Sequence, residues 1–149
     1  MVFKEYVPIT PLRNYINCFW FYDESKVESD GINERIIPDG CIEIVFHLGD
    51  RVIRSTSEKS DWNPRCNLIG QMTTPYFIQP TGHTSMIGVR FFPHTASFFI
   101  NSPLTELTNQ VLPVQAVLGQ KIKLITEQIQ SLQAPIAIIN CLESFFLKQ

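Results

Sequence analysis

Residues 37–48, IPDGCIEIVFHL, decide the fold because they join a tight turn to an alternating strand. Proline fixes its own φ and glycine readily takes a positive φ, so Pro38-Asp39-Gly40 predicts a turn. The strand that follows should place successive side chains on opposite faces. One face is aliphatic and suits a core, whereas the other mixes polar and apolar side chains: Ile42, Ile44, Phe46 and Leu48 against Cys41, Glu43, Val45 and His47.

Short strand-like segments continue downstream of this strand. Residues 68–71 and 75–78 each predict a short strand, and residues 85–92 form the longest β-like run before Pro93 ends it. Residues 55–65, STSEKSDWNPR, predict a surface loop because they are polar and interrupted by proline. Short strands separated by turns, without long helices between them, favour an antiparallel barrel or sandwich over a parallel sheet.

The segment upstream of the turn predicts a helix followed by a strand. Threonine can cap free amides and proline fits a first helical turn, so Thr10-Pro11 suits a helix start. Apolar residues then recur at helical spacing: Leu12, Tyr15, Ile16 and Phe19. We expect this short helix to lead into an aromatic strand over residues 19–22 and then into a polar loop over residues 23–31.

The last third of the chain changes to a helical period. Apolar residues three or four positions apart predict an amphipathic helix over residues 114–132, although Gly119 can interrupt its first turns. Pro135 suits the first turn of a second helix, which the pattern carries to residue 147. Antiparallel strands followed by helices predict an α+β domain.

Composition and charge argue against several classes of protein. The 149 residues suit one domain with its own core, since 44% of them are hydrophobic. Twelve basic and fourteen acidic side chains leave a net charge of -2, so this chain alone should bind nucleic acid poorly. We find no secretion signal, no membrane-spanning run and no CxxC pair, and we expect a cytoplasmic protein with reduced thiols. The cysteines are Cys18, Cys41, Cys66 and Cys141.

Four segments in a fixed order, the last of them in two parts, resemble a known family. They are LRNYINCFWFY at 12–22, IPDGCIEIVFHL at 37–48, LIGQMTTP at 68–75, IGVRFFP at 87–93 and SPLTEL at 102–107. Together they resemble the N-terminal regulatory domain of AraC-type transcription regulators, of the subgroup with PDG, GQ and GVRF-P segments. Each segment is short, and their order carries the resemblance over nearly the whole chain.

The resemblance implies a single regulatory domain over residues 1–149. Its β-barrel part would cover residues 1–93, as a mainly antiparallel cupin-like barrel over about 10–93. Its helical part would cover residues 94–149, with helices over about 95–148. A helix-turn-helix DNA-binding domain would follow Gln149 in the full-length protein.

The resemblance also implies a barrel lumen that can bind a small effector. Candidates for its lining combine apolar walls with a few polar groups that orient a ligand: Trp20, Tyr22, Glu43, Phe46, His47, Met86, Arg90 and Phe91. The strand period leaves open which face is the lumen, and it places Phe46 and Glu43 on opposite faces of a regular strand. Arg90 and Glu43 can alternatively form a buried structural pair.

The apolar stripe of the helix over residues 114–132 also has two interpretations. It can pack against its own barrel, or it can pair with its copy in a second subunit, as related regulators often dimerise through helices after the barrel. Both can hold, because one stripe can be shared between core and interface. The candidate dimerisation residues are Val117, Leu118, Ile122, Ile125 and Ile129.

Catalysis is the less favoured alternative. The GxSxG, HExxH and P-loop motifs are all missing from the sequence. Cys41 and Cys66 have no histidine and acid partner that the sequence places beside them. A cupin-like metal centre would have to use a poorly spaced set of ligands, because no HxH pair exists and Glu43 lies about 13 Å from His47 along a strand. That set is Glu43, His47, His83 and His94.

The sequence therefore predicts a bacterial ligand-sensing or dimerisation domain that is not an enzyme and has no catalytic residue, metal or cofactor. An unidentified small molecule would bias an attached DNA-binding domain by a population shift. We expect a homodimer that contacts DNA only through that other domain and does not contact a membrane. The alternative is a stand-alone cupin-like enzyme with a His/Glu metal site.

Overall fold

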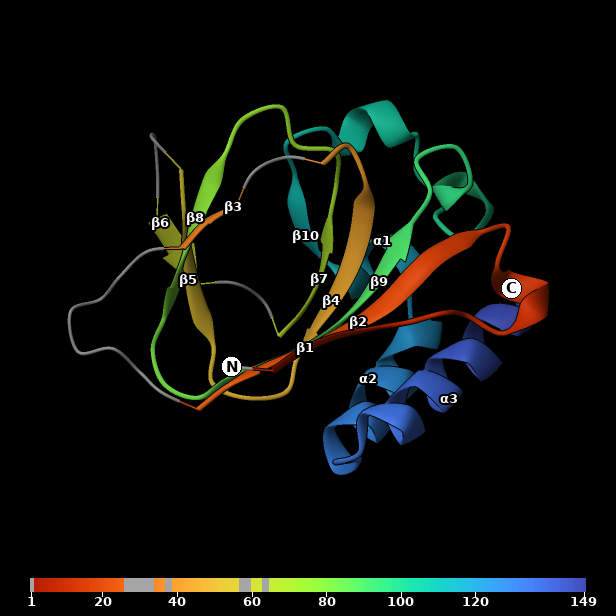
Figure 1. The fold of residues 1–149 in the computed structure, drawn as a ribbon. Coiled ribbons are helices and arrows are strands. Elements are labelled where there is room, and N and C mark those ends of the chain that lie inside the picture. Colours follow the sequence, from red (N-terminus) through yellow and green to blue (C-terminus); the bar gives the residue numbers. More distant parts are fainter. Residues whose placement is uncertain (1, 26–33, 37–38, 57–59, 63–64) are drawn as a thin grey trace.

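The structure, a computed structural model, describes residues 2–25, 34–36, 39–56, 60–62 and 65–149. It consists of two antiparallel sheets and a group of C-terminal helices (Figure 1). The smaller sheet faces one side of the larger sheet, and the helices cover the larger sheet's other side. The α+β class that the sequence predicted, with antiparallel strands before helices, is confirmed.

The larger sheet has six strands in the order β1-β2-β9-β4-β7-β10, and each neighbouring pair is antiparallel. Their bounds are Val2–Tyr6 (β1), Ile16–Glu24 (β2), Ile42–His47 (β4), Cys66–Ile69 (β7), Thr84–Phe91 (β9) and Val111–Pro113 (β10). β4 is the predicted alternating strand, and it lies between β9 and β7. The turn before it also follows the prediction in its described part, since Gly40 has a φ of 77° and the Cys41 N–H donates to Asp39 Oδ1 at 2.9 Å. Pro38 lies outside the described residues.

The smaller sheet has four strands in the order β3-β8-β5-β6. Their bounds are Glu34–Ile36 (β3), Val52–Ser55 (β5), Ser60–Trp62 (β6) and Tyr76–Pro80 (β8). The prediction of a surface loop over residues 55–65 is wrong at β6, which pairs with β5 at the edge of the smaller sheet. An edge strand needs a partner on one side only and can carry polar residues. Residues 57–59 and 63–64 lie outside the described part. Within the described ranges, the strands form two sheets and not one closed barrel.

The N-terminal segment differs most from the prediction. Only Thr10–Leu12 form a helical turn, and β2 begins at Ile16, where a helix was expected to continue. β2 pairs with β9 on one side and with β1, which was not predicted, on the other. These long-range hydrogen bonds outweigh the helical spacing of the apolar residues. Ile16 and Phe19 are three residues apart, so a regular strand would place them on opposite faces. A register shift between Ile16 and Cys18 lets both be fully buried.

The C-terminal helices follow the predicted periods. They are α1 (Val114–Leu118), α2 (Lys121–Ser131) and α3 (Pro135–Leu147). Gly119 separates α1 from α2, at the position where the sequence allowed an interruption. The part expected to be only helical, residues 94–149, also contains β10, which pairs with β7. None of the helices in the described ranges combines the length and the apolar character that crossing a membrane requires.

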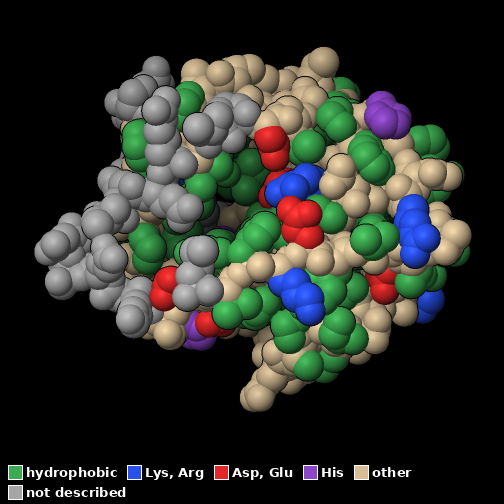
Figure 2. Space-filling model, viewed as in Figure 1, with side chains coloured by type: hydrophobic (Ala, Val, Ile, Leu, Met, Phe, Trp, Pro, Cys, Tyr) green, Lys and Arg blue, Asp and Glu red, His purple; other side chains and the backbone are tan. Residues whose placement is uncertain are grey.

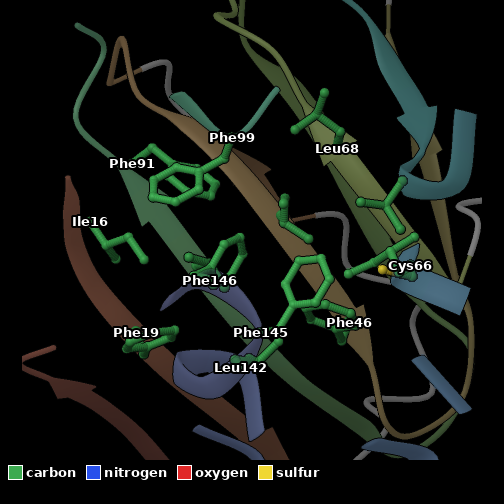
Figure 3. Packing of buried hydrophobic residues seen from close by; sticks show 14 of the residues in the cluster. Ile16, Phe19, Phe46, Cys66, Leu68, Phe91, Phe99, Leu142, Phe145 and Phe146 are labelled. Carbon is green, nitrogen blue, oxygen red and sulfur yellow. The ribbon is translucent and has the colours of Figure 1, made fainter. Parts of the chain in front are cut away.

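The main hydrophobic core lies between the larger sheet and the helices. Phe146 of α3 lies beside Phe91 of β9 and Phe99 (Figure 3). The ring centroids of Phe91 and Phe99 are 5.6 Å and 5.2 Å from that of Phe146. Phe46 of β4 is fully buried in the same cluster. Burying each such side chain stabilises the fold by roughly 2–3 kcal/mol. The aliphatic face of β4 is therefore core, as predicted.

The apolar stripe of α1 and α2 packs against the same core. Three of the five candidate dimerisation residues are buried and two are half-buried: Val117, Ile122 and Ile129, then Leu118 and Ile125. The stripe therefore follows the first interpretation, in which it covers its own sheet. Three of the side chains chosen for a dimer surface therefore face inward in this chain, whereas Leu118 and Ile125 remain partly exposed. Leu124, which is 71% exposed, faces outward from α2 instead.

Candidate ligand-binding site

A cavity of about 230 Å³ lies between the two sheets. Its floor is the face of the larger sheet that is turned away from the helices, and its roof comes from β3 and β8. Figure 2 shows a hollow in this side of the molecule, with hydrophobic side chains around it and a basic side chain flanked by acidic ones beside it. The lining residues are Phe3, Trp20, Tyr22, Ile36, Asp39, Glu43, Val45, His47, Asn67, Ile69, Tyr76, Ile78, Pro80, Thr84, Met86 and Arg90.

Strand register arranges the floor in three rows that cross β2, β9 and β4. The rows are Cys18-Arg90-Glu43, Trp20-Gly88-Val45 and Tyr22-Met86-His47. Every second residue of a strand faces the same side, so one face of β4 presents Glu43, Val45 and His47. An ion pair and a histidine therefore stand at opposite ends of the floor, with an apolar row between them.

Gly88 allows the Trp20 indole to lie across the middle row. A Cβ atom on Gly88 would stand 2.1 Å from Trp20 Cε2, far inside van der Waals contact. Glycine in a strand often marks such a close approach. Trp20 is 8% exposed, and Phe3 of β1 lies beside it with ring centroids 6.3 Å apart. Trp20 is thus a flat apolar part of the cavity floor.

Arg90 and Glu43 form the ion pair that the sequence left open as a structural alternative. Arg90 Nε donates to Glu43 Oε1 at 2.9 Å, Asp39 Oδ2 lies 3.9 Å from the same nitrogen, and Glu5 Oε1 lies 3.8 Å from Arg90 Nη1. Burial raises the pKa of Glu43, although the hydrogen bond and charge of Arg90 oppose this shift. The nearby Trp20 indole also lowers the pKa of Glu43 slightly, although Trp20 Nε1 has no hydrogen bond of ordinary geometry to a described residue. One guanidinium therefore faces three carboxylates.

His47 stands at the other end of the floor, and its ring is buried without a partner. It is 2% exposed, and neither Nδ1 nor Nε2 has a hydrogen-bond partner among the residues that the structure describes. Burial, together with the positive charges of Arg65 and Arg51, lowers the pKa of His47 to about 4. The imidazole is therefore neutral at pH 7, with one N–H donor and one acceptor nitrogen.

The smaller sheet supplies an apolar roof with one polar group. Tyr76, Ile78 and Pro80 of β8 alternate along the strand and all line the cavity. Burial raises the pKa of the Tyr76 phenol above its ordinary value, and the negative charge of Glu43 raises it further. The phenol stays protonated, so it offers a hydrogen bond without a charge. The sequence predicted a strand over residues 75–78 but assigned no site residue to it.

The cavity brings together six of the eight predicted ligand-binding residues: Trp20, Tyr22, Glu43, His47, Met86 and Arg90. The prediction is wrong for Phe46 and Phe91, which are fully buried in the core on the other face of the larger sheet. They have the opposite strand parity to Glu43 and Arg90, and side-chain type cannot override that parity. The buried polar residues Asn67 and Thr84, which also line the cavity, were missed.

The histidines and acidic residues do not gather into a metal site. His83 is exposed and lies 3.0 Å from Asp23 Oδ2 through Nε2, and His94 is exposed in the turn after β9. Neither of them lines the cavity with Glu43 and His47. Within the described ranges, no group of three or more His, Cys, Asp or Glu side chains is placed to hold a metal ion.

The cysteines do not provide an activated nucleophile. All four are free thiols. Burial raises the pKa of Cys18 to about 11 and that of Cys66 to about 12. Burial also raises the pKa of Cys41, which follows the turn at Gly40. Thiols with raised pKa values stay protonated at neutral pH and react slowly as nucleophiles.

One family matches most of the chain. Its description is Domain of unknown function (DUF6597), and it matches residues 4–113. This range begins in β1 and ends with β10, so it includes both sheets and every lining residue of the cavity except Phe3. The helices α1, α2 and α3 lie outside it. No curated protein matches the chain.

Proposed function

The chain belongs to the DUF6597 family, and we propose that it is the ligand-sensing domain of an AraC-type transcription regulator. In this proposal, a small molecule binds between the two sheets and biases an attached DNA-binding domain. The observation that carries the proposal is the cavity of about 230 Å³, which has an apolar floor and polar groups at its two ends. Ligand pockets usually combine apolar walls with a few placed polar groups.

The PDG, GQ and GVRF segments, three of those that carry the resemblance to AraC-type regulators, contact one another near one end of the cavity, which supports the proposal. Gln71 of the GQ segment donates from Nε2 to the carbonyl oxygen of Gly40 in the PDG segment at 2.9 Å. Asp39 of the PDG segment lies 3.9 Å from Arg90 of the GVRF segment, and that segment also supplies Gly88 to the floor. On this basis we propose that the two sheets are an open form of a cupin-like barrel.

The coupling that we propose runs through the larger sheet. β4 carries cavity residues on one face and core residues on the other, so a shift of the strand reaches the helices directly. At its end, the carbonyl oxygen of His47 accepts a hydrogen bond from Gln130 Nε2 of α2 at 3.3 Å. A ligand that favours one arrangement of β4 and α2 would shift the population toward that arrangement.

The proposal assigns binding, and not catalysis, to the cavity. The support comes from four of its ionisable groups: Arg90 and Glu43 are paired, Tyr76 is protonated, and the low pKa of His47 makes its imidazole a weak base. We further propose a cytoplasmic homodimer that reaches DNA only through the attached domain, as the resemblance implies. The proposed role in transcription regulation would be contradicted by a full gene product that continues past Gln149 without a helix-turn-helix motif.

Native mass spectrometry of the purified protein tests the binding half, by comparing its native mass with its denatured mass. We expect a retained or added small molecule that is lost in Met86→Trp, because the indole would fill the cavity. Phe77→Trp is the matched control. Phe77 lies between the lining residues Tyr76 and Ile78 on β8, so its side chain faces away from the cavity, and it is 37% exposed. A small molecule that survives Met86→Trp, or a stoichiometric transition metal in a monomer, would contradict the proposal.

A further inference from the structure

We propose that the cavity takes a neutral, mainly aromatic molecule that is held by one hydrogen-bonding group against His47. This inference rests on the ligand-binding function proposed above and adds the chemical class of the ligand. It follows from the cavity's size, its stacking surfaces, its charge and the His47 ring, whose two nitrogens are both buried without a hydrogen-bond partner among the described residues.

The volume sets the size of the ligand. An apolar protein cavity of about 150 Å³ is large enough to bind benzene. By simple proportion, the volume of about 230 Å³ here suits roughly nine or ten non-hydrogen atoms. That is the size of a substituted single ring or of two fused rings.

Aromatic surfaces set the shape of the ligand. The Trp20 indole lies flat over Gly88 on the floor, and Tyr76 closes the roof opposite the larger sheet. Tyr22 and Phe3 add further ring surface to the lining. Aromatic rings favour stacked or edge-to-face contact with another ring beyond the effect of buried area alone. A flat ring system fits between this floor and roof.

His47 is the group that the ligand would satisfy. Its ring is 2% exposed and lines the cavity, and no described residue accepts from or donates to its nitrogens. A buried polar group without a partner raises the free energy of the folded protein. A ligand hydroxyl can either donate to the unprotonated imidazole nitrogen or accept from the ring N–H, so it would give one of the two nitrogens a partner and remove part of this penalty.

Charge at the opposite end argues against an anionic ligand. Arg90 is the only Lys or Arg side chain among the described lining residues. It is already paired with Glu43, since Arg90 Nε donates to Glu43 Oε1 at 2.9 Å. Asp39 and Glu5 stand 3.9 Å and 3.8 Å from the same guanidinium, so the acidic groups outnumber it. A carboxylate or phosphate on the ligand would be repelled and would find no free cation there. At the other end, the positive charges of Arg65 and Arg51 act on His47, but both side chains are exposed and neither lines the cavity, so a buried anion has no cation among the described residues to pair with there either. The hydrogen-bonding group that fits is therefore neutral.

Four compounds with one naphthalene ring system test the inference by isothermal titration and NMR at pH 7. The probes are 2-naphthol, naphthalene, 2-naphthoate and 2-naphthylmethylammonium. We expect 2-naphthol to bind roughly five- to tenfold more tightly than naphthalene, which is the net effect of one buried hydrogen bond. We expect 2-naphthoate to bind more weakly than naphthalene. The ring ¹⁵N resonances of His47 should shift with 2-naphthol and not with naphthalene.

Variants of His47 separate its role from that of the cavity. In His47→Leu the preference for 2-naphthol over naphthalene should vanish, while naphthalene itself still binds. His47→Gln, which keeps a donor and an acceptor, should retain part of the preference, and the exposed His94→Gln should leave it unchanged.

Three results would overturn the inference: an unchanged preference in His47→Leu, a charged probe that binds more tightly than 2-naphthol, or no binding by any of the four. The first two would leave the proposed function standing, because a probe would still occupy the cavity. In the third case the proposed function depends on the native-mass experiment alone.

Discussion

Acidification should destabilise this protein through His47, and the size of the effect can be worked from the burial of its ring. The pKa of His47 is about 4 in the folded chain, against an ordinary value of 6.5 that applies when the chain unfolds. Above pH 6.5 both states hold a neutral ring, and the histidine makes no difference. As the pH falls from there toward 4, the unfolded state takes up a proton that the folded state does not, so the free energy of unfolding decreases.

Each pKa unit of difference corresponds to about 1.4 kcal/mol. Between pH 7 and pH 5 the folded ring stays neutral while the unfolded ring becomes almost fully charged, so the expected loss is roughly 2 kcal/mol. The ring lies 2% exposed, with Arg65 and Arg51 as its nearest influential charges, so solvent screens it little. Carboxylates elsewhere add their own pH dependence, and a variant must therefore isolate the histidine.

Urea denaturation of wild type and His47→Leu at pH 7, 6 and 5 measures this difference. We expect the variant to be at least as stable as wild type at pH 7, because an unpaired polar group is replaced by an apolar one. On acidification to pH 5, it should lose roughly 2 kcal/mol less than wild type. His94→Gln should follow the wild-type curve. If wild type and His47→Leu lose the same stability, the imidazole is not buried neutral and the argument fails.

Three further changes test the floor, the ion pair and the core by urea denaturation. Gly88→Ala should cost roughly 1–3 kcal/mol and alter Trp20 fluorescence, because the new methyl overlaps the indole; unchanged fluorescence would contradict this geometry. Arg90→Met should lower the free energy of unfolding by roughly 1–3 kcal/mol at pH 7, because it leaves Glu43 buried without its partner. The double variant Arg90→Met/Glu43→Gln should recover part of this loss, and a double variant with no recovery would contradict a stabilising pair. Phe146→Ala should cost roughly 3–5 kcal/mol, and a loss below 1 kcal/mol would place this ring outside the core.

Local periodicity in the sequence was enough to predict the central strand and the C-terminal helices. β4 alternates with a period of two and α3 repeats with the helical period, and both patterns depend only on residues close together in the chain. The turn at Gly40 was predictable for the same reason, because its positive φ is a local property. The pairing of Arg90 with Glu43 was an open alternative that the strand register decided.

Local periodicity failed where long-range pairing set the structure. Residues 12–19 repeat with a helical spacing, yet the second half of this segment, from Ile16 on, is a strand because it pairs with β9, and with β1 from Phe19 on. The polar residues of β6 looked like a loop because their pairing partner, β5, could not be identified from the sequence.

The candidate site divides in the same way. The sequence by itself determined which residues share a face, so Glu43 and His47 were grouped together and separated from Phe46. Only the tertiary structure decided that the helices cover the face of Phe46 and that the smaller sheet covers the face of His47. The physical reason is that side-chain direction follows from the backbone of one strand, whereas the neighbour that meets each face comes from distant parts of the chain.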